Sequence, residues 1–425
     1  MAAQAAPLAL GVDLGSSGMR IALANWVGER IVEHACPYPR PFSDPHGWRE
    51  GLITLCHQLT AQQRSQVGGV AIDGTSGTLL LCRPDGELAA TPLHQALPYN
   101  QACPEQAGVA RAIAGAGPAA SASGSLARAL GLLETAAACR QTGPWLLRHQ
   151  ADWLMGWLLG DWRWGEEGNN LRLGWDLQER SWRGAIGAQP WSASLPAVRA
   201  SGEVVGCLQP GAAQALGLPQ TCRVVAGTTD ANAAVLAADP QERDGVAVLG
   251  TTLVLKQWSP RPIEGPGVSC HRLAGRWLVG GASNAGAGVL RRFYSDSELT
   301  ELSRQIDPKR NSGLQLRPLP CRGERFPLDD PTLEPVLEPR PVSDVLYLQG
   351  LLEGLARIEA AGWRRLQTLG APAVERVITV GGGAVNPQWR QIRAQLLGGL
   401  PVLNRPGLSA ALGMARLAAT ALSRP

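Results

Sequence analysis

Asp13-Leu14-Gly15-Ser16-Ser17-Gly18 (DLGSSG) separates two short apolar runs near the start of the chain. Leu8–Val12 precedes it and Met19–Asn25 follows it, a pattern typical of a strand, a tight turn and a second strand. Residues 246–257 show the same pattern around Gly250-Thr251-Thr252. The two halves therefore indicate a duplication, although they do not repeat one another in sequence identity.

Strand patterns alternate with helical patterns along the chain. Asp73-Gly74-Thr75-Ser76-Gly77 is a third turn of this style between apolar runs, and Leu346–Leu369 has apolar residues at helical spacing. Such alternation predicts an α/β protein. For 425 residues we expect two domains. The boundary falls near Gly227–Ala238, and we assign residues 1–228 to an N-terminal domain and 229–425 to a C-terminal domain.

Composition excludes several classes of protein. No run approaches the roughly 20 apolar residues of a membrane-spanning helix. The net charge of +4 is spread without a basic stripe, which disfavours nucleic-acid binding. Nine scattered cysteines without a CxxC pair disfavour a zinc site and favour reduced thiols in the cytoplasm. Residues 1–10 lack the basic start of a secretory signal.

The first turn has the chemistry of an anion site. Gly15 and Gly18 allow close backbone approach, and successive N–H groups in such a turn can hold a phosphate. Asp13 ends the preceding strand, and a carboxylate beside a phosphate requires a cation between them, which suggests Mg²⁺. The spacing is neither GxGxxG nor a Walker A loop. A plain hairpin is the alternative interpretation of this turn.

Two further turns offer bare backbone to a ligand. Gly250-Thr251-Thr252 presents backbone N–H groups and two hydroxyls after an apolar strand. Gly381-Gly382-Gly383-Ala384 directly follows the strand pattern Val377–Val380 and could lie against a flat ring, with Asn386 within reach to donate and accept hydrogen bonds. A flexible linker is the alternative interpretation of the three glycines.

Asp230 is the second candidate catalytic carboxylate. It follows the strand pattern Arg223–Ala226 and begins an Ala-rich helical run, Ala231–Ala238. A carboxylate at the end of a strand is well placed for chemistry at the edge of a sheet. The alternative is a helix N-cap, which stabilises a helix by about 1 kcal/mol.

Five motifs in this order resemble the FGGY carbohydrate kinases, and the resemblance covers most of the chain. They are DLGSSGMR (13–20), DGTSG (73–77), GTTDA (227–231), LGTT (249–252) and VGGGAVN (380–386). The chain is most similar to the short plant and cyanobacterial xylulokinase-like enzymes assigned to D-ribulose. The resemblance implies two ribonuclease-H-like α/β domains of the actin/hexokinase-like ATPase fold, with the active site in the cleft between them.

The resemblance also implies roles for these motifs. The Asp13–Ser17 turn, with Ser16 and Ser17, would reach the transferred phosphoryl group and its Mg²⁺. Asp230 would be the general base, and Asp13, Ser76 and Asp230 would contact the sugar. The nucleotide residues would be Gly250, Thr251 and Thr252 at the phosphates of MgATP, and Gly381, Gly382, Gly383, Ala384 and Asn386 at adenine and ribose.

The sequence departs from the family pattern at several positions. Ser16 stands where many relatives have Thr, which keeps the hydroxyl. Leu408 stands where relatives often have Glu, which puts a local polar contact in doubt. Asn100 and Gln101 are neutral where many relatives have an Asp/Arg-type sugar contact. The chain is also shorter than most members, which predicts a more open sugar pocket.

The resulting prediction is an ATP-dependent sugar kinase, monomeric or homodimeric, of the cytoplasm or an organelle stroma. Its partners would be small molecules only, with D-ribulose as first substrate, D-xylulose next and a polyol such as glycerol third. A nucleotide-binding regulator without sugar activity is an alternative, although the presence of both Asp13 and Asp230 argues against it. Another ATPase of the same superfold, actin-like or heat-shock-like, is the last alternative, but that class lacks the pairing of GTTDA with LGTT.

Overall fold

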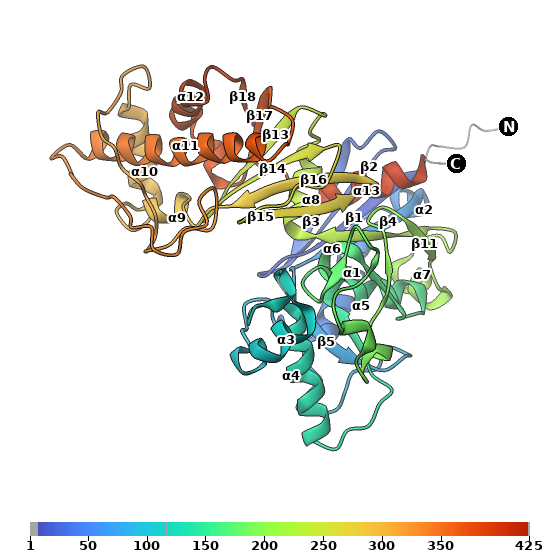
Figure 1. The fold of residues 1–425 in the computed structure, drawn as a ribbon. Coiled ribbons are helices and arrows are strands. Elements are labelled where there is room, and N and C mark those ends of the chain that lie inside the picture. Colours follow the sequence, from blue (N-terminus) through green and yellow to red (C-terminus); the bar gives the residue numbers. More distant parts are fainter. Residues whose placement is uncertain (1–6, 116, 424–425) are drawn as a thin grey trace. The chain divides into compact units, whose positions relative to one another are not determined.

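The computed structural model describes residues 7–115 and 117–423. Contacts group the chain into two compact units (Figure 1). The first unit comprises Met1–Ala237, Arg272–Gly275 and Ser409–Pro425, and the second comprises Ala238–His271 and Arg276–Leu408. Each contains a six-stranded mixed sheet, so the expectation of two α/β domains is confirmed. The expected absence of a secretory signal concerns residues 1–10, of which 1–6 lie outside the described residues.

The sheet of the first unit has the strand order β11-β12-β4-β1-β2-β3. Strands β1, β2 and β3 form an antiparallel meander, and β4 and β12 run parallel to β1. The carboxyl ends of β1, β4 and β12 therefore meet at one edge of the sheet. The bounds are β1 Leu8–Leu14, β2 Met19–Ala24, β3 Arg30–Cys36, β4 Val67–Gly74, β11 Val204–Cys207 and β12 Arg223–Thr229.

Helices cover both faces of this sheet. One face packs against α1, α5 and α7 in a core that contains Trp48, Leu52 and Leu154. The other face packs against α8 and α13, where Met414 and Ala233 contact the small residues of the strands. The bounds are α1 Pro45–His57, α2 Ala61–Ser65, α5 Gln150–Leu159, α7 Pro210–Leu216, α8 Asp230–Ala237 and α13 Ala410–Leu422.

A further lobe of the first unit follows β4 and has its own core, which includes Leu81, Leu126 and Leu147. Its main elements are the β5–β6 pair and the helices α3 and α4. The bounds are β5 Leu79–Cys82, α3 Ala107–Ala114, α4 Ser125–Ala138, β6 Leu146–His149, β7 Trp164–Glu166, α6 Glu167–Asn170, β8 Trp175–Asp176, β9 Ser181–Trp182 and β10 Ala197–Arg199.

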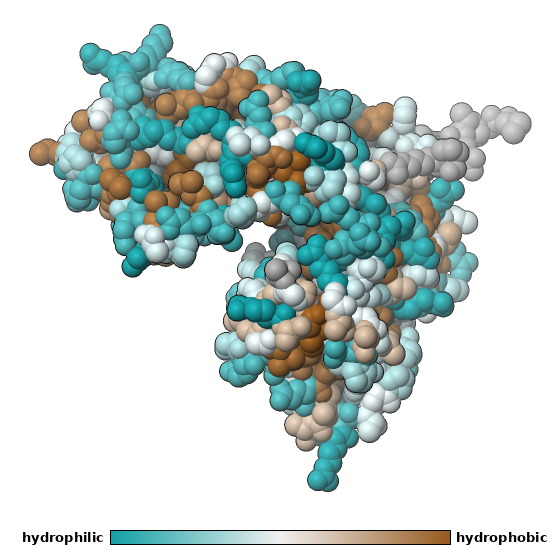
Figure 2. Space-filling model, viewed as in Figure 1, coloured by the Kyte–Doolittle hydropathy of each residue, from teal (hydrophilic) through white to brown (hydrophobic). Residues whose placement is uncertain are grey.

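The sheet of the second unit has the order β15-β16-β14-β13-β17-β18. Its core is built on the long helix α11, whose Leu348, Leu351 and Leu355 pack with Phe326 and Trp389. On the face shown in Figure 2, hydrophobic patches lie over the part that carries α9, α10 and α11. The bounds are β13 Asp244–Leu249, β14 Leu253–Ser259, β15 Val268–Leu273, β16 Arg276–Ala282, α9 Ala287–Leu290, α10 Asp296–Gln305, α11 Asp344–Thr368, β17 Arg376–Val380, α12 Pro387–Leu396 and β18 Val402–Asn404.

Five strands of each sheet share one order and direction, as the repeated turn pattern predicts, whereas the sixth strands, β11 and β15, lie at opposite edges. In the first unit β1 pairs antiparallel with β2 and parallel with β4. In the second unit β13 pairs antiparallel with β14 and parallel with β17. The turn at residues 15–18 is therefore equivalent to the turn at residues 250–252, and the turn after β4 is equivalent to the turn after β17.

Segments after residue 228 also belong to the first unit. Helix α8 packs in the first unit, and the chain returns there from Ser409 onward through α13. Among the described residues, no helix is long and apolar enough to cross a membrane.

Candidate active site

Three aspartates meet at the carboxyl edge of the first sheet. Asp13 near the end of β1 is in register with Asp73 on the parallel strand β4. Asp73 is in turn in register with Thr228 on β12, and Asp230 follows two residues later as the first residue of α8. The structure therefore brings together the two carboxylates that the sequence singled out. It adds Asp73, which the sequence analysis quoted in DGTSG but assigned no role.

Asp73 is an unusual carboxylate. Its side chain is fully buried, and no N–H or O–H group of the described residues donates a hydrogen bond to it. The Asp13 carboxyl lies within hydrogen-bonding reach. Burial raises the pKa of Asp73 well above its ordinary value, and the charges of Asp13 and Asp230 raise it further. Two such carboxyls can share one proton or one cation.

The environment of Asp230 suits a general base. Burial raises its pKa to about 6, opposed by a hydrogen bond from the backbone N–H of Ala231 to Oδ1 (2.7 Å) and reinforced by the charge of Asp13. Since the carboxylate binds the N–H of the next residue, the geometry is not that of an N-cap, which binds the second or third N–H of the helix. A base with a pKa near the working pH is the more effective proton acceptor.

The strand end before Asp230 is set by a close approach of two backbones. The register of β12 against β4 is irregular between Val225 and Thr228. A Cβ at Gly227 would lie 1.7 Å from the carbonyl oxygen of Ile72, so only glycine fits there. Asp230 lies two residues after Thr228, where this irregularity ends.

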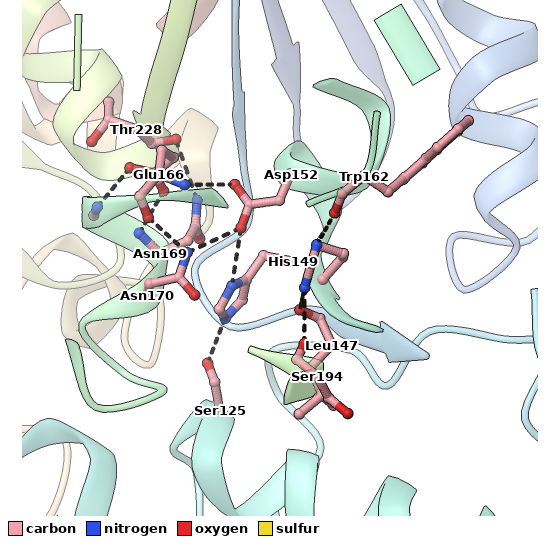
Figure 3. A network of polar contacts seen from close by, with 12 residues as sticks. Ser125, Leu147, His149, Asp152, Trp162, Glu166, Asn169, Asn170, Ser194 and Thr228 are labelled. Atoms are coloured by element: carbon pink, nitrogen blue, oxygen red, sulfur yellow. Dashed lines mark hydrogen bonds and ion pairs between the residues drawn. The ribbon is translucent and has the colours of Figure 1, made fainter. Parts of the chain in front are cut away.

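A buried polar network supports this strand end (Figure 3). Asn169 donates through Nδ2 to the Thr228 carbonyl (3.5 Å), and the Glu166 carboxylate accepts from the backbone N–H of Asn169 (2.5 Å). The Glu166 backbone N–H donates to Oδ1 of Asp152 (3.0 Å). Burial and the charge of Asp152 raise the pKa of Glu166 to about 8. This network, which no sequence motif indicates, joins β7 and α6 to β12.

The same network contains a serine, a histidine and an aspartate in line. Nε2 of His149 lies 3.0 Å from Oγ of Ser125, and its Nδ1 lies 3.5 Å from Oδ2 of Asp152. The order resembles a hydrolase triad, but all three side chains are fully buried, so a substrate could not reach Ser125. The three residues tie α4, β6 and α5 together (Figure 3).

The turn after β1 is held by hydrogen bonds that involve Tyr38 and Gln150. The Tyr38 hydroxyl donates to the Gly15 carbonyl (2.7 Å) and accepts from Nε2 of Gln150 (3.3 Å). Oε1 of Gln150 accepts from the backbone N–H of Thr75 (3.2 Å). The first turn and the DGTSG turn are thus joined through two side chains. Ser16 and Ser17 are exposed on the first turn, and Ser76 is half-buried on the other.

The second unit contains a cavity of about 810 Å³ beside the other two turns. Five residues predicted for the nucleotide line it: Gly250, Thr251, Gly382, Gly383 and Asn386. The predicted Thr252, Gly381 and Ala384 do not line it. Its apolar walls, which no sequence motif indicates, include Leu290, Leu299, Leu348, Leu352 and Val385.

The amide of Asn386 is committed to the fold. Its Oδ1 caps α12 by accepting from the backbone N–H of Trp389 (2.9 Å), and its Nδ2 donates to Oγ of Ser303 on α10 (2.9 Å). Asn386 therefore joins α10 to α12 at the wall of the cavity. Apolar walls with bare glycine backbone on one side are suited to a flat heterocycle.

Residues 245–422 match the FGGY family of carbohydrate kinases, C-terminal domain. The second half of the chain is an FGGY carbohydrate kinase C-terminal domain. It contains the cavity and all the predicted nucleotide residues except Ser16 and Ser17, whereas Asp13, Ser76 and Asp230 lie outside it. The expected similarity to FGGY carbohydrate kinases is confirmed over these residues.

Solved structures show that the fold of FGGY-type kinases extends over the whole chain. The chain is similar to a xylulose kinase from Brucella ovis (20% identity, TM-score 0.81, covering 98% of this chain and 91% of that one). It is also similar to a xylulose kinase from Bifidobacterium adolescentis (19%, 0.77, 98% and 93%). A Plasmodium falciparum glycerol kinase solved with ADP matches at 13% identity (TM-score 0.79, 98% and 90%). At such identities the likeness establishes the fold, which is the actin/hexokinase-like ATPase fold expected from the sequence.

Proposed function

We propose that the protein phosphorylates a hydroxyl of a pentulose, D-ribulose, with MgATP, and that Asp230 is the general base. The observation that carries this proposal is the position of Asp230 beside Asp13, where burial raises its pKa to about 6. At neutral pH the carboxylate is then mostly ionised and ready to accept a proton. Phosphoryl transfer depends on positioning and charge neutralisation, with a positioned base for the attacking hydroxyl.

Asp13 and Asp73 fit a hard cation. A buried carboxylate without a hydrogen-bond donor, beside a second carboxyl, is the donor chemistry that Mg²⁺ prefers. Among the described residues no group of three or more His, Cys, Asp or Glu could hold a metal alone, so phosphate oxygens would complete the shell. Bound Mg²⁺ would neutralise the charge of the transferred phosphoryl group. Asp13 would hold it, and Asp73 would keep Asp13 in place.

The cavity in the second unit would hold the nucleotide. Gly382 and Gly383 would lie against adenine, with Asn386 at the wall of the pocket, and the turn Gly250–Thr252 would bind phosphates. Gly381, Ala384 and Thr252 do not line the cavity and would support the conformation of these turns. Ser16 and Ser17, exposed on the turn after β1, would contact the transferred phosphoryl group.

The sugar would contact Asp13, Ser76 and Asp230 at the edge of the first sheet. The choice of D-ribulose rests on the motif resemblance. D-Xylulose is the alternative that the neighbouring xylulose kinases favour, and glycerol follows from the glycerol kinase.

The test is an ADP-release assay with MgATP over a panel of ketoses, aldoses and polyols. We expect the highest kcat/KM with D-ribulose. A higher kcat/KM with D-xylulose or glycerol would correct the substrate and leave the kinase assignment standing. Tight ATP binding with no ADP release from any panel compound would refute the proposal and support a nucleotide-binding regulator.

A further inference from the structure

Arg128 on α4 is a buried cation whose hydrogen bonds, within the described part of the chain, all go to backbone carbonyls. Its side chain is fully buried. Nε donates to the Gln101 carbonyl (2.9 Å), Nη1 donates to the Gly77 carbonyl (3.0 Å), and Nη2 donates to the Tyr99 carbonyl. One guanidinium therefore joins two separate turns, the DGTSG turn that bears Ser76 and the turn Pro98–Gln101.

No carboxylate among the described residues pairs with Arg128. Burial, with a smaller effect of Arg172, lowers its pKa to about 10, so the group stays charged at neutral pH. A buried charge without a counter-ion is costly unless it is hydrogen-bonded. The three carbonyls provide that compensation, and the planar fork of arginine in turn fixes where those carbonyls lie.

A further hydrogen bond joins the segments of the two turns. The backbone N–H of Tyr99 donates to Oγ1 of Thr78 (3.1 Å), and the turn Pro98–Gln101 is closed by a bond from the Gln101 N–H to the Pro98 carbonyl (3.0 Å). Tyr99, Asn100 and Gln101 are exposed there, while Ser76 is half-buried. Neutral amides both donate and accept, as the hydroxyls of an uncharged sugar require.

We propose that Arg128 is a positioning residue that shapes the acceptor site for an uncharged sugar, by holding the turn Pro98–Gln101 against the turn that bears Ser76. This inference rests on the proposed sugar kinase activity. Arg128 does not touch the sugar or the reacting atoms. It sets the distance between Ser76 and the amides of Asn100 and Gln101, and therefore the affinity for the acceptor, while the phosphates and Asp230 are held by other elements.

The chain offers a matched control in Arg148 on β6. This side chain is also buried, and its pKa is likewise lowered to about 10 by burial. Among the residues that the structure describes, it too donates only to carbonyls, those of Leu147 (2.7 Å), Ser194 (3.0 Å) and Trp162. These acceptors, labelled in Figure 3, lie outside both turns. Arg128→Lys and Arg148→Lys therefore remove the same chemistry at two places, because lysine keeps the charge but loses the fork.

The experiment measures KM for the sugar, KM for ATP and kcat in both variants, with D-ribulose or the panel sugar that the wild type phosphorylates fastest. For Arg128→Lys we expect the sugar KM to rise roughly tenfold, as lost hydrogen bonds from a charged group imply, with kcat and the ATP KM within about twofold. Arg148→Lys should lower thermal stability similarly and leave the sugar KM unchanged. Equal effects of the two variants, or an unchanged sugar KM in Arg128→Lys, would overturn the inference.

Hydrogen exchange on the wild type covers the case in which Arg128→Lys does not fold. Saturating sugar should slow amide exchange in residues 74–79 and 97–103, and leave residues 146–149 and 192–195 unchanged. Absence of protection in the first two segments would overturn the inference while kinase activity stands. A wild type that phosphorylates no sugar would instead refute the proposed function, and the inference with it.

Discussion

The ion pair of Glu359 and Arg393 provides a quantitative test of how the second unit is held together. Nε and Nη2 of Arg393 on α12 contact the Glu359 carboxylate on α11 at 2.6 and 2.8 Å, and both side chains are 1% exposed. Nη1 of Arg393 also donates to Oγ1 of Thr379 on β17 (2.6 Å). The pair therefore joins two helices to the strand that leads into the glycine turn of the cavity.

Glu359→Gln keeps the shape of the side chain and leaves the Arg393 charge buried without a counter-ion. Breaking such a buried pair costs about 3–5 kcal/mol in the free energy of unfolding. For a domain of 150–250 residues this corresponds to a fall in Tm of roughly 6–20 °C. Differential scanning calorimetry would measure the shift in the transition of the second unit.

The matched control is the exposed pair of Arg243 and Glu375. It has a similar N–O distance of 2.9 Å, but its side chains are 58% and 64% exposed. Exposed pairs contribute about 0–1 kcal/mol, so Glu375→Gln should shift Tm by no more than a few degrees. A Glu359→Gln variant no less stable than Glu375→Gln would refute this view of the second unit.

Three further predictions concern the active site. Since Asp230 acts as a base with a pKa of about 6, kcat/KM for the sugar should fall as pH drops below about 6 and reach a plateau above it; a flat profile from pH 5 to 8 would argue against this role. A Cβ at Gly383 would lie 2.7 Å from the Leu249 side chain. A Cβ at Gly382 would have no atom of the described residues within 4 Å. Gly383→Ala should therefore distort the cavity wall and lower Tm, whereas Gly382→Ala should keep the Tm of the wild type but place a methyl group where adenine would lie. Both variants should weaken ATP binding measured by calorimetry, and wild-type affinity in Gly382→Ala would contradict this account. Tyr38→Phe removes the bond to the Gly15 carbonyl, so it should lower kcat and cost about 1 kcal/mol of stability; kinetics unchanged from the wild type would show that the turn does not depend on it.

Local patterns in the sequence predicted the features that depend on local structure. The turns at Asp13–Gly18 and Gly250–Thr252 connect adjacent antiparallel strands, so their residue types report directly on their conformation. Asp230 could likewise be recognised where a strand pattern changes to a helical one. The order of the motifs then predicted the two-domain α/β architecture that the two sheets confirm.

The features that the sequence did not reveal depend on contacts between distant residues. Asp73 became a candidate only through its register with Asp13, 60 residues earlier. Arg128 has no motif of its own, and its role follows from carbonyls of two other segments. The return of α13 to the first unit could not be read from its Ala-rich sequence, because many partners would accept such a helix.

Phosphoryl transfer to the sugar in the Asp230→Asn variant tests the central claim most directly. The exposed Asp239→Asn, two residues after α8, is the control. In single turnovers with saturating MgATP and D-ribulose, Asp239→Asn should match the wild type. Asp230→Asn should be slower by about 10²–10⁴-fold while it binds ATP as tightly, as expected on loss of a general base. A rate within a few-fold of the wild type in Asp230→Asn would contradict the account.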